Sequence, residues 1–295
     1  MFKGSIPALI TPFRDGAVDI QTYTKLIERQ IEAGCHGLVP CGTTGESATL
    51  SPEEHKQLIK HCVEVSAGRV PIIAGSGSNS TALAIKKAKA VQEAGADAAL
   101  VVAPYYNKPS QEGLYQHFKA VHDSVDIPII LYNVPGRTVV DISIDTVLRT
   151  AEMPRIQGIK DANPDMERVR TFKARLGEDF SLLSGDDETA GEYLRQGGHG
   201  CISVSANVAA EHVAGMQTAW MSGDTDMFEE LEELLKPLHD AMFCDASPAP
   251  AKYALWKMGL CRNELRLPMV TACAEACAQV DAVMEQLGLE IQEAA

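Results

Sequence analysis

Several segments of the sequence place reactive side chains directly after short apolar runs. In residues 41–47, Cys-Gly-Thr-Thr-Gly-Glu-Ser, two hydroxyl groups stand in a turn bounded by glycines. Such a turn can expose backbone N–H groups beside the hydroxyls of Thr43 and Thr44 and form a cradle for a carboxylate or phosphate. An ordinary glycine-rich loop would account for the same residues. The other candidates in these segments are Tyr106, Tyr132, Arg137, Lys160 and the run Ser184-Gly-Asp-Asp187.

Lys160 has the most specific chemistry of these candidates, because it closes the apolar run 156–160. Its stem could be buried and its amine simply solvated. In an apolar pocket beside a cation such as Arg137, however, the amine can be held neutral and can attack a ketone to form an imine. Tyr132 and Tyr106 are suitable proton carriers for that reaction, and an arginine is suited to bidentate capture of a carboxylate.

The pattern of histidines and cysteines does not support metal or redox chemistry. The eight histidines are scattered and form neither His-x-His nor His-Glu-x-x-His. The eight cysteines form no Cys-x-x-Cys pair. We therefore predict a site without a metal.

The elements that must position these residues alternate in a regular pattern along the chain. Short apolar runs without polar alternation are separated by helical segments, which is typical of parallel strands buried on both faces. Eight strands alternating with helices predict a (β/α)₈ barrel with its site at the carboxyl ends of the strands. An open doubly wound sheet is the alternative, but no Gly-x-Gly-x-x-Gly or P-loop motif is present. The predicted strands are 6–10, 37–39, 70–74, 98–102, 128–132, 156–160, 181–184 and 200–203, and the predicted helices between them are 20–33, 52–67, 81–94, 111–124, 143–151, 164–176 and 187–196.

This pattern changes after Gly223, where helical segments follow one another without a strand. Residues 224–243, 248–259 and 268–287 predict three helices, the first with an apolar stripe at helical spacing. We therefore predict a barrel catalytic domain over residues 1–223 and a C-terminal three-helix domain over residues 224–295.

Composition excludes two classes of function. The net charge is −14 and no basic stripe is present, so nucleic-acid binding is not expected. No stretch approaches the roughly 20 apolar residues of a membrane span. The first apolar run is broken by Pro7 and Pro12 and makes a poor signal peptide. We expect a soluble cytoplasmic protein.

Taken in their order along the chain, these segments resemble those of one superfamily of pyruvate-dependent class I aldolases. That superfamily contains dihydrodipicolinate synthase and N-acetylneuraminate lyase. The resemblance extends from Gly4 to Met269, essentially the whole chain, and is best to the dihydrodipicolinate synthase branch. Each matching motif is weak evidence by itself, but all of them in this order are specific for the family. The matching motifs are residues 42–47, 104–107, 109–118, 132–138, 158–160 and 184–187.

The resemblance implies that Lys160 forms a Schiff base with pyruvate and that no other cofactor is needed. Tyr132 would be the general acid and base, and Thr43 would link it to Tyr106 in a proton relay. Tyr106 would come from a second subunit across a tight dimer interface. The substrate-binding residues implied are Thr44 for the pyruvate carboxylate, Arg137 for the carboxylate of the second substrate, and Gly185 and Ile202 beside the imine.

The implied reaction condenses pyruvate with L-aspartate 4-semialdehyde to 4-hydroxy-tetrahydrodipicolinate, in lysine and diaminopimelate biosynthesis. Relatives are usually homotetramers built as dimers of tight dimers. Arg137 favours this activity, because N-acetylneuraminate lyases lack an arginine at this place. A pyruvate-dependent aldolase or dehydratase acting on sugar acids is the alternative, and a non-catalytic 2-oxo acid binding protein is a further one.

Lysine-inhibited members of the family bind L-lysine at the tight dimer interface, and this sequence matches that pocket only in part. Pro52 and Leu83 replace a histidine and a glutamate. Without the glutamate a lysine ammonium would lack its carboxylate partner, so we predict weak or absent feedback inhibition. Cys41 is a second departure without a derived role. The residues that match, as a vestigial lysine site, are Ser47, His55, Asn79 and Tyr105.

Overall fold

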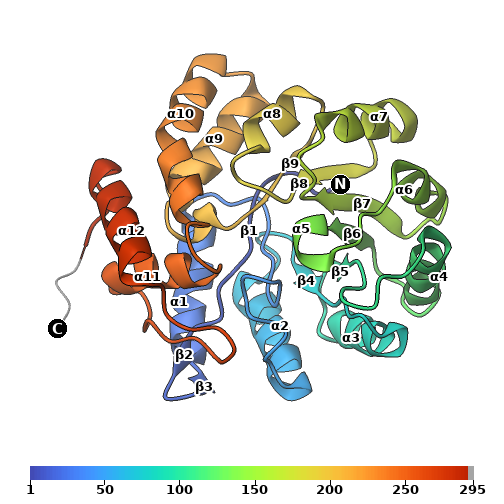
Figure 1. Cartoon of the computed structure of the whole chain (residues 1–295), viewed down its shortest axis with the longest axis horizontal. Coiled ribbons are helices and arrows are strands. Elements are labelled where there is room, and N and C mark those ends of the chain that lie inside the picture. Colours follow the sequence, from blue (N-terminus) through green and yellow to red (C-terminus); the bar gives the residue numbers. More distant parts are fainter. Residues whose placement is uncertain (292–295) are drawn as a thin grey trace.

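A ring of parallel strands surrounded by helices forms the centre of the computed structural model, which describes residues 1–291 (Figure 1). Seven strands form one parallel sheet in the order β1-β9-β8-β7-β6-β5-β4. Their bounds are β1 (Gly4–Pro7), β4 (Ile73–Gly75), β5 (Ala98–Val102), β6 (Ile129–Asn133), β7 (Ile156–Asp161), β8 (Ser181–Ser184) and β9 (Gly200–Ser203).

Residues 37–39 close this sheet into a ring between β1 and β4. Parallel bridges join Ala8 to Val39 and Leu38 to Ile72. The N–H of Val39 donates to the carbonyl of Pro7 at 2.9 Å, which ties the segment to β1. The predicted (β/α)₈ barrel is therefore confirmed, with the second predicted strand reduced to two isolated bridges.

Both faces of the strands are buried, which explains why the apolar runs do not alternate. One set of side chains fills the inside of the barrel, including Ile6, Ile73, Leu100, Ile130 and Leu183. The other set, including residues such as Leu131 and Ile159, packs beneath the surrounding helices.

The helices around the barrel begin at recognisable caps. Ser51, for example, accepts a hydrogen bond from the N–H of Glu54 at 3.1 Å, and the Glu54 carboxylate accepts one from the N–H of Ser51 at 2.9 Å. The outer helices are α1 (Ile20–Glu32), α2 (Pro52–Ser66), α3 (Thr81–Glu93), α4 (Gln111–His122), α6 (Ile144–Ala151), α7 (Met166–Leu176), α8 (Ala190–Arg195) and α9 (Ala210–Ser222).

Helix α9 and four short elements were not among the predicted segments. Most faces of α9 are apolar and it packs between the barrel and α10, so its sequence lacks a contrast between two faces. The short elements are β2 (Phe13–Arg14), β3 (Ala17–Val18), α5 (Pro135–Thr138) and the 3₁₀ helix η1 (Ser205–Asn207).

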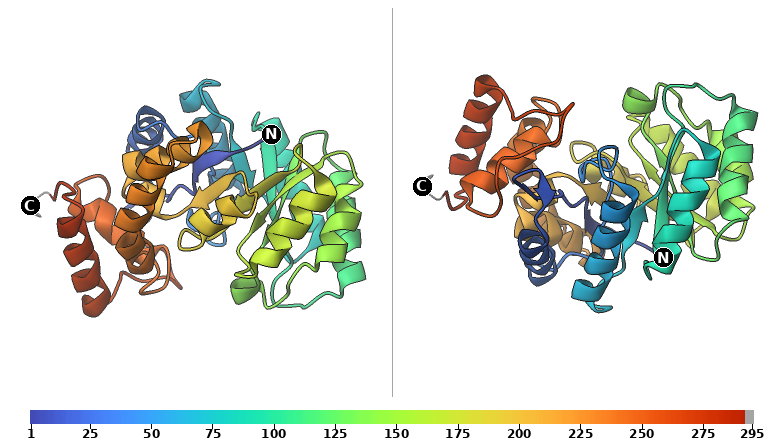
Figure 2. Two further views of the ribbon diagram at one scale, coloured as in Figure 1. Left: turned by 90° about the horizontal axis from the view of Figure 1, so that it is seen from above. Right: turned by 90° about the horizontal axis from the view of Figure 1, so that it is seen from below.

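The C-terminal helices α10 (Thr225–Ala241), α11 (Ala249–Lys257) and α12 (Ala274–Gln286) lie at one end of the molecule, opposite α3 and α4 (Figure 2). Side chains of α10 and α12 share one apolar core with Val213 and Met216 of α9. The division at residue 223 stays a prediction, and residues 292–295 of the predicted second domain lie outside the described residues. No helix in the described part of the chain has both the length and the apolar character for a membrane span.

Candidate active site

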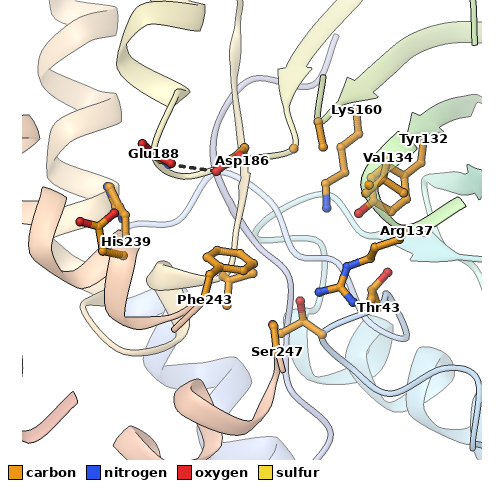
Figure 3. A pocket seen from close by; sticks show the side chains of 16 residues that line it. Thr43, Tyr132, Val134, Arg137, Lys160, Asp186, Glu188, His239, Phe243 and Ser247 are labelled. Atoms are coloured by element: carbon orange, nitrogen blue, oxygen red, sulfur yellow. Dashed lines mark hydrogen bonds between the residues drawn. The ribbon is translucent and has the colours of Figure 1, made fainter. Parts of the chain in front are cut away.

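A cavity of about 500 Å³ lies at the carboxyl ends of the strands (Figure 3). Figure 3 shows Lys160 and Tyr132 pointing into it from neighbouring strands, with Arg137 and Thr43 on the adjoining wall. The predicted site residues that line the cavity are Thr43, Thr44, Tyr132, Arg137, Lys160 and Gly185.

Lys160 and Tyr132 are neighbours because β6 and β7 pair in a register that sets them opposite each other. The Lys160 Nζ lies 4.2 Å from the centre of the Tyr132 ring. Both residues are buried, each with 6% of its surface exposed. A largely desolvated amine beside a phenol can form an imine and exchange protons with its neighbour.

The carboxylate that follows Lys160 in the chain is directed elsewhere. Asp161 accepts hydrogen bonds from Arg168 Nε at 2.8 Å and from Asn133 Nδ2 at 2.9 Å. Burial raises the pKa of Asp161, and the Arg168 guanidinium opposes that rise. This buried network on the far side of β7 was not predicted, because the packing of α7 and β6 against β7, and not a sequence motif, brings its members together.

The turn that carries Thr43 and Thr44 is tightly held. The N–H of Glu46 donates to the Thr43 carbonyl at 3.0 Å, and the Thr11 hydroxyl donates to the Gly45 carbonyl at 2.7 Å. A Cβ on Gly45 would lie 3.0 Å from a backbone oxygen, so glycine is needed there. Thr44 is buried and Thr43 is exposed at the mouth of the cavity.

Arg137 belongs to the short helix α5 and is exposed at the wall between two cavities. It lines the 500 Å³ cavity and also a neighbouring one of about 300 Å³. Gly185 follows β8, and a Cβ there would lie 2.8 Å from the Cβ of Ala162. Ile202 is buried inside the barrel with Tyr132 and does not line the cavity.

Tyr106 lines neither the 500 Å³ nor the 300 Å³ cavity. Its side chain is 88% exposed, and its backbone has φ +74°, a conformation that bulky residues rarely adopt. One chain therefore does not bring Tyr106 together with the other predicted catalytic residues.

The residues predicted to form a vestigial lysine site are only partly gathered in one place. Ser47 and Tyr105 line the 300 Å³ cavity. His55 is buried, bonds the Gly75 carbonyl through Nε2 at 2.7 Å, and has its pKa lowered to about 4 by burial. Asn79 is half-buried, and its carbonyl accepts from Asn107 Nδ2 at 2.9 Å.

Lys87 and Cys41 both line a third, smaller cavity that Tyr132 also lines. Lys87 of α3 is half-buried, and it lines the 300 Å³ cavity as well. Its pKa is lowered by burial, and the sequence pattern alone did not single it out. The Cys41 thiol is buried and its pKa is raised by burial, so it packs rather than reacts.

The far wall of the 500 Å³ cavity includes polar residues to which the sequence analysis gave no role. Asp186 follows β8 and has its pKa raised, chiefly by burial. His239 of α10 also lines the cavity and bonds the Ser205 hydroxyl at 2.8 Å through Nδ1. Asp186 belongs to a motif that was recognised, whereas only tertiary structure brings His239 to the barrel. Among the described residues, no cluster of three or more His, Cys, Asp or Glu residues is arranged to hold a metal.

The dihydrodipicolinate synthetase family model matches residues 1–287 of the chain. The chain is 56% identical over 291 residues to the 4-hydroxy-tetrahydrodipicolinate synthase of Hyphomonas neptunium, covering 98% of this chain and 99% of that protein. It superimposes on the dihydrodipicolinate synthase of Aquifex aeolicus with a TM-score of 0.96 at 43% identity, over 99% and 100% of the two chains. A chloride-inhibited dihydrodipicolinate synthase from Acinetobacter baumannii, complexed with pyruvate, gives a TM-score of 0.95 at 45% identity over 98% and 100%.

Proposed function

The chain belongs to the dihydrodipicolinate synthetase family, and we propose that it condenses pyruvate with L-aspartate 4-semialdehyde to 4-hydroxy-tetrahydrodipicolinate. This reaction belongs to lysine and diaminopimelate biosynthesis. The observation that carries the proposal is the buried Lys160 amine, 4.2 Å from the Tyr132 ring, at the wall of a cavity that Thr43 and Thr44 also line.

In the first step the neutral Lys160 amine attacks the C2 carbonyl of pyruvate. Thr44 and the N–H groups of its turn hold the carboxylate. Tyr132 delivers the proton that lets the carbinolamine lose water, and the imine forms. Thr43 passes protons between Tyr132 and Tyr106. The imine itself serves as the electron sink, so the reaction requires no metal and no further cofactor.

In the second step loss of a C3 proton converts the imine into an enamine, which attacks the aldehyde carbon of the second substrate. Arg137 binds the carboxylate of that substrate and orients it. The amino group of the bound semialdehyde then attacks C2. This closes the ring, breaks the bond to Lys160 and frees the amine.

A second copy of the chain completes the site. Tyr106, at 88%, and Tyr105, at 39%, are exposed, and the Asn107 to Asn79 hydrogen bond holds their loop beside the start of α3, where Leu83 is 43% exposed. Exposed apolar side chains gathered in this way are typical of an interface. We propose a tight dimer at this surface and a homotetramer of two such dimers. The eight cysteines are all free, which suits the cytoplasm.

The test is a coupled assay with pyruvate and L-aspartate 4-semialdehyde, together with borohydride reduction in the presence of pyruvate. The wild-type protein is expected to turn over and to carry a reduced pyruvate adduct on Lys160, found by peptide mass analysis. Lys160→Ala is expected to do neither. Turnover by Lys160→Ala, or an unmodified wild-type protein, would refute the proposal.

A further inference from the structure

A buried ion pair connects the turn of Thr43 and Thr44 to the C-terminal helix α11. Lys252 Nζ lies 2.5 Å from Glu46 Oε1, and the two side chains are 0% and 2% exposed. Removing two charges from water is costly, and replacement of such a pair by apolar residues is often neutral for stability. A contribution to stability alone therefore does not account for this pair.

Each partner is held by further contacts. Lys252 Nζ donates to the Glu264 carbonyl at 2.8 Å and lies 4.2 Å from the centre of the Phe13 ring. The second carboxylate oxygen of Glu46 accepts from the N–H of Arg266 at 3.1 Å. Burial lowers the pKa of Lys252, and Glu46 is the main group that opposes this. The carboxylate of Glu46 is thus clamped between α11 and the segment that follows it.

The contacts of Glu46 with Lys252 and Arg266 bear directly on the conformation of the turn. Glu46 has φ +53°, in the left-handed region, and its N–H donates to the Thr43 carbonyl. A change in the direction of the Glu46 side chain would therefore rotate the peptide groups beside Thr43 and Thr44. From the opposite side, the Thr11 hydroxyl holds the Gly45 carbonyl, so the turn has one anchor in the barrel and one in the C-terminal helices.

We propose that Lys252 and Glu46 are positioning residues, whose ion pair holds the Thr43–Thr44 turn in the geometry that binds the carboxylate of the first substrate. The inference rests on the proposed function in taking that substrate to be pyruvate. It gives the C-terminal helices a role in binding this substrate. The defect expected from breaking the pair is specific to pyruvate, whereas general destabilisation would affect both substrates.

The experiment compares the variants Lys252→Met, Glu46→Gln and Lys252→Met/Glu46→Gln with the wild-type protein. Pyruvate is titrated in borohydride trapping, and KM and kcat are measured for both substrates. Each variant is expected to need on the order of tenfold more pyruvate for half-maximal trapping, since small displacements of binding groups have large effects. Trapping at saturating pyruvate and KM for the semialdehyde are expected to be unchanged.

Lys257→Met is the matched control. Lys257 lies on the same helix, and its partner is Asp281 of α12, with Nζ 3.3 Å from Oδ1. The control therefore removes a lysine ion pair from α11 without touching the turn, and its half-saturating pyruvate concentration is expected to equal that of the wild type. An equal defect in Lys257→Met would overturn the proposal.

The double variant protects the test against misfolding, because it removes both buried charges. It is expected to keep the wild-type thermal midpoint while binding pyruvate weakly. Wild-type pyruvate binding in the double variant would overturn the proposal, and so would its failure to fold, which would assign the pair to stability. If borohydride traps a pyruvate adduct on the wild-type protein and the variants have the same half-saturating pyruvate concentration, only this inference fails. If the wild-type protein is not trapped, the proposed function fails and the inference falls with it.

Discussion

Arg137 is the side chain that selects the second substrate in the proposed reaction. It stands at the wall of the cavity and is free to reach an incoming carboxylate. Arg137→Ala is expected to lower kcat/KM for L-aspartate 4-semialdehyde on the order of 100-fold, because a charge-assisted bidentate contact is lost. Half-saturating pyruvate in borohydride trapping serves as the control and should stay at the wild-type value. A parallel loss of pyruvate binding would contradict the assigned role.

Two buried histidines make the stability of the fold depend on pH. Burial lowers the pKa of His55 and of His117 to about 4. Both are neutral in the folded protein at neutral pH, whereas in the unfolded chain they take up protons near pH 6.5. The unfolded state therefore binds more protons, and the free energy of unfolding falls as pH falls from about 6.5 to about 4.

The variant His117→Asn isolates the contribution of His117 to the pH dependence of the free energy of unfolding. Its loss of stability between pH 7 and pH 4.5, measured by urea unfolding, is expected to be smaller than that of the wild type by roughly 2 kcal/mol. His61, a half-buried histidine with a bond to Thr24, provides a control substitution. Equal pH dependence of His117→Asn and wild type would show that the pKa of His117 is the same in the folded and the unfolded protein, which would contradict the argument from burial.

Strand β7 depends on a buried network behind its catalytic face. Arg168 of α7 and Asp161 of β7 are 5% and 2% exposed and pair at 2.8 Å. Arg168→Met is expected to lower the free energy of unfolding by about 3 to 5 kcal/mol, because it leaves Asp161 buried without its cation. Adding Asp161→Asn should recover much of the loss, as measured by chemical denaturation. The single variants Arg168→Met and Asp161→Asn need not lose equal free energy of unfolding. A double variant no more stable than Arg168→Met would contradict this explanation of the loss.

The elements show where sequence reasoning succeeds and where it stops. Strands β5 to β9 are predicted to within about one residue, because burial on both faces leaves a continuous apolar run. Helix α9 is mostly apolar, with only a narrow exposed polar face that includes Glu211, Thr218 and Ser222, so its periodic signal is weak. The site residues Lys160, Tyr132 and Arg137 follow from motifs. By contrast, His239 and Lys252 reach the site or its turn only through tertiary packing.

L-Lysine is expected to have little effect on the assembled protein. Lys87 already places a half-buried amine at the cavity that contains Ser47 and Tyr105, where no glutamate stands at position 83. Glu46 also lines this cavity, but its carboxylate is already paired with Lys252. A ligand ammonium would therefore meet the like charge of Lys87 without the acidic partner that a glutamate at position 83 would provide. Rates measured with submillimolar L-lysine should equal those without it. Lys87→Ala/Leu83→Glu is the variant expected to gain sensitivity, and strong inhibition of the wild type would refute the prediction.

The proposed sharing of the active site between two chains has a consequence for mixed dimers. Lys160→Ala and Tyr106→Phe are each expected to be nearly inactive, since each homodimer lacks one group in both sites. In a mixed dimer, the Lys160 of one subunit meets the Tyr106 of the other in one of the two sites, and the second site lacks both groups. Random reassociation makes half of the dimers mixed, so about a quarter of the wild-type activity is expected to return. Gel filtration verifies reassembly, and wild-type protein taken through the same cycle sets the reference. A site built within a single chain would give no gain on mixing, because no subunit would hold both groups.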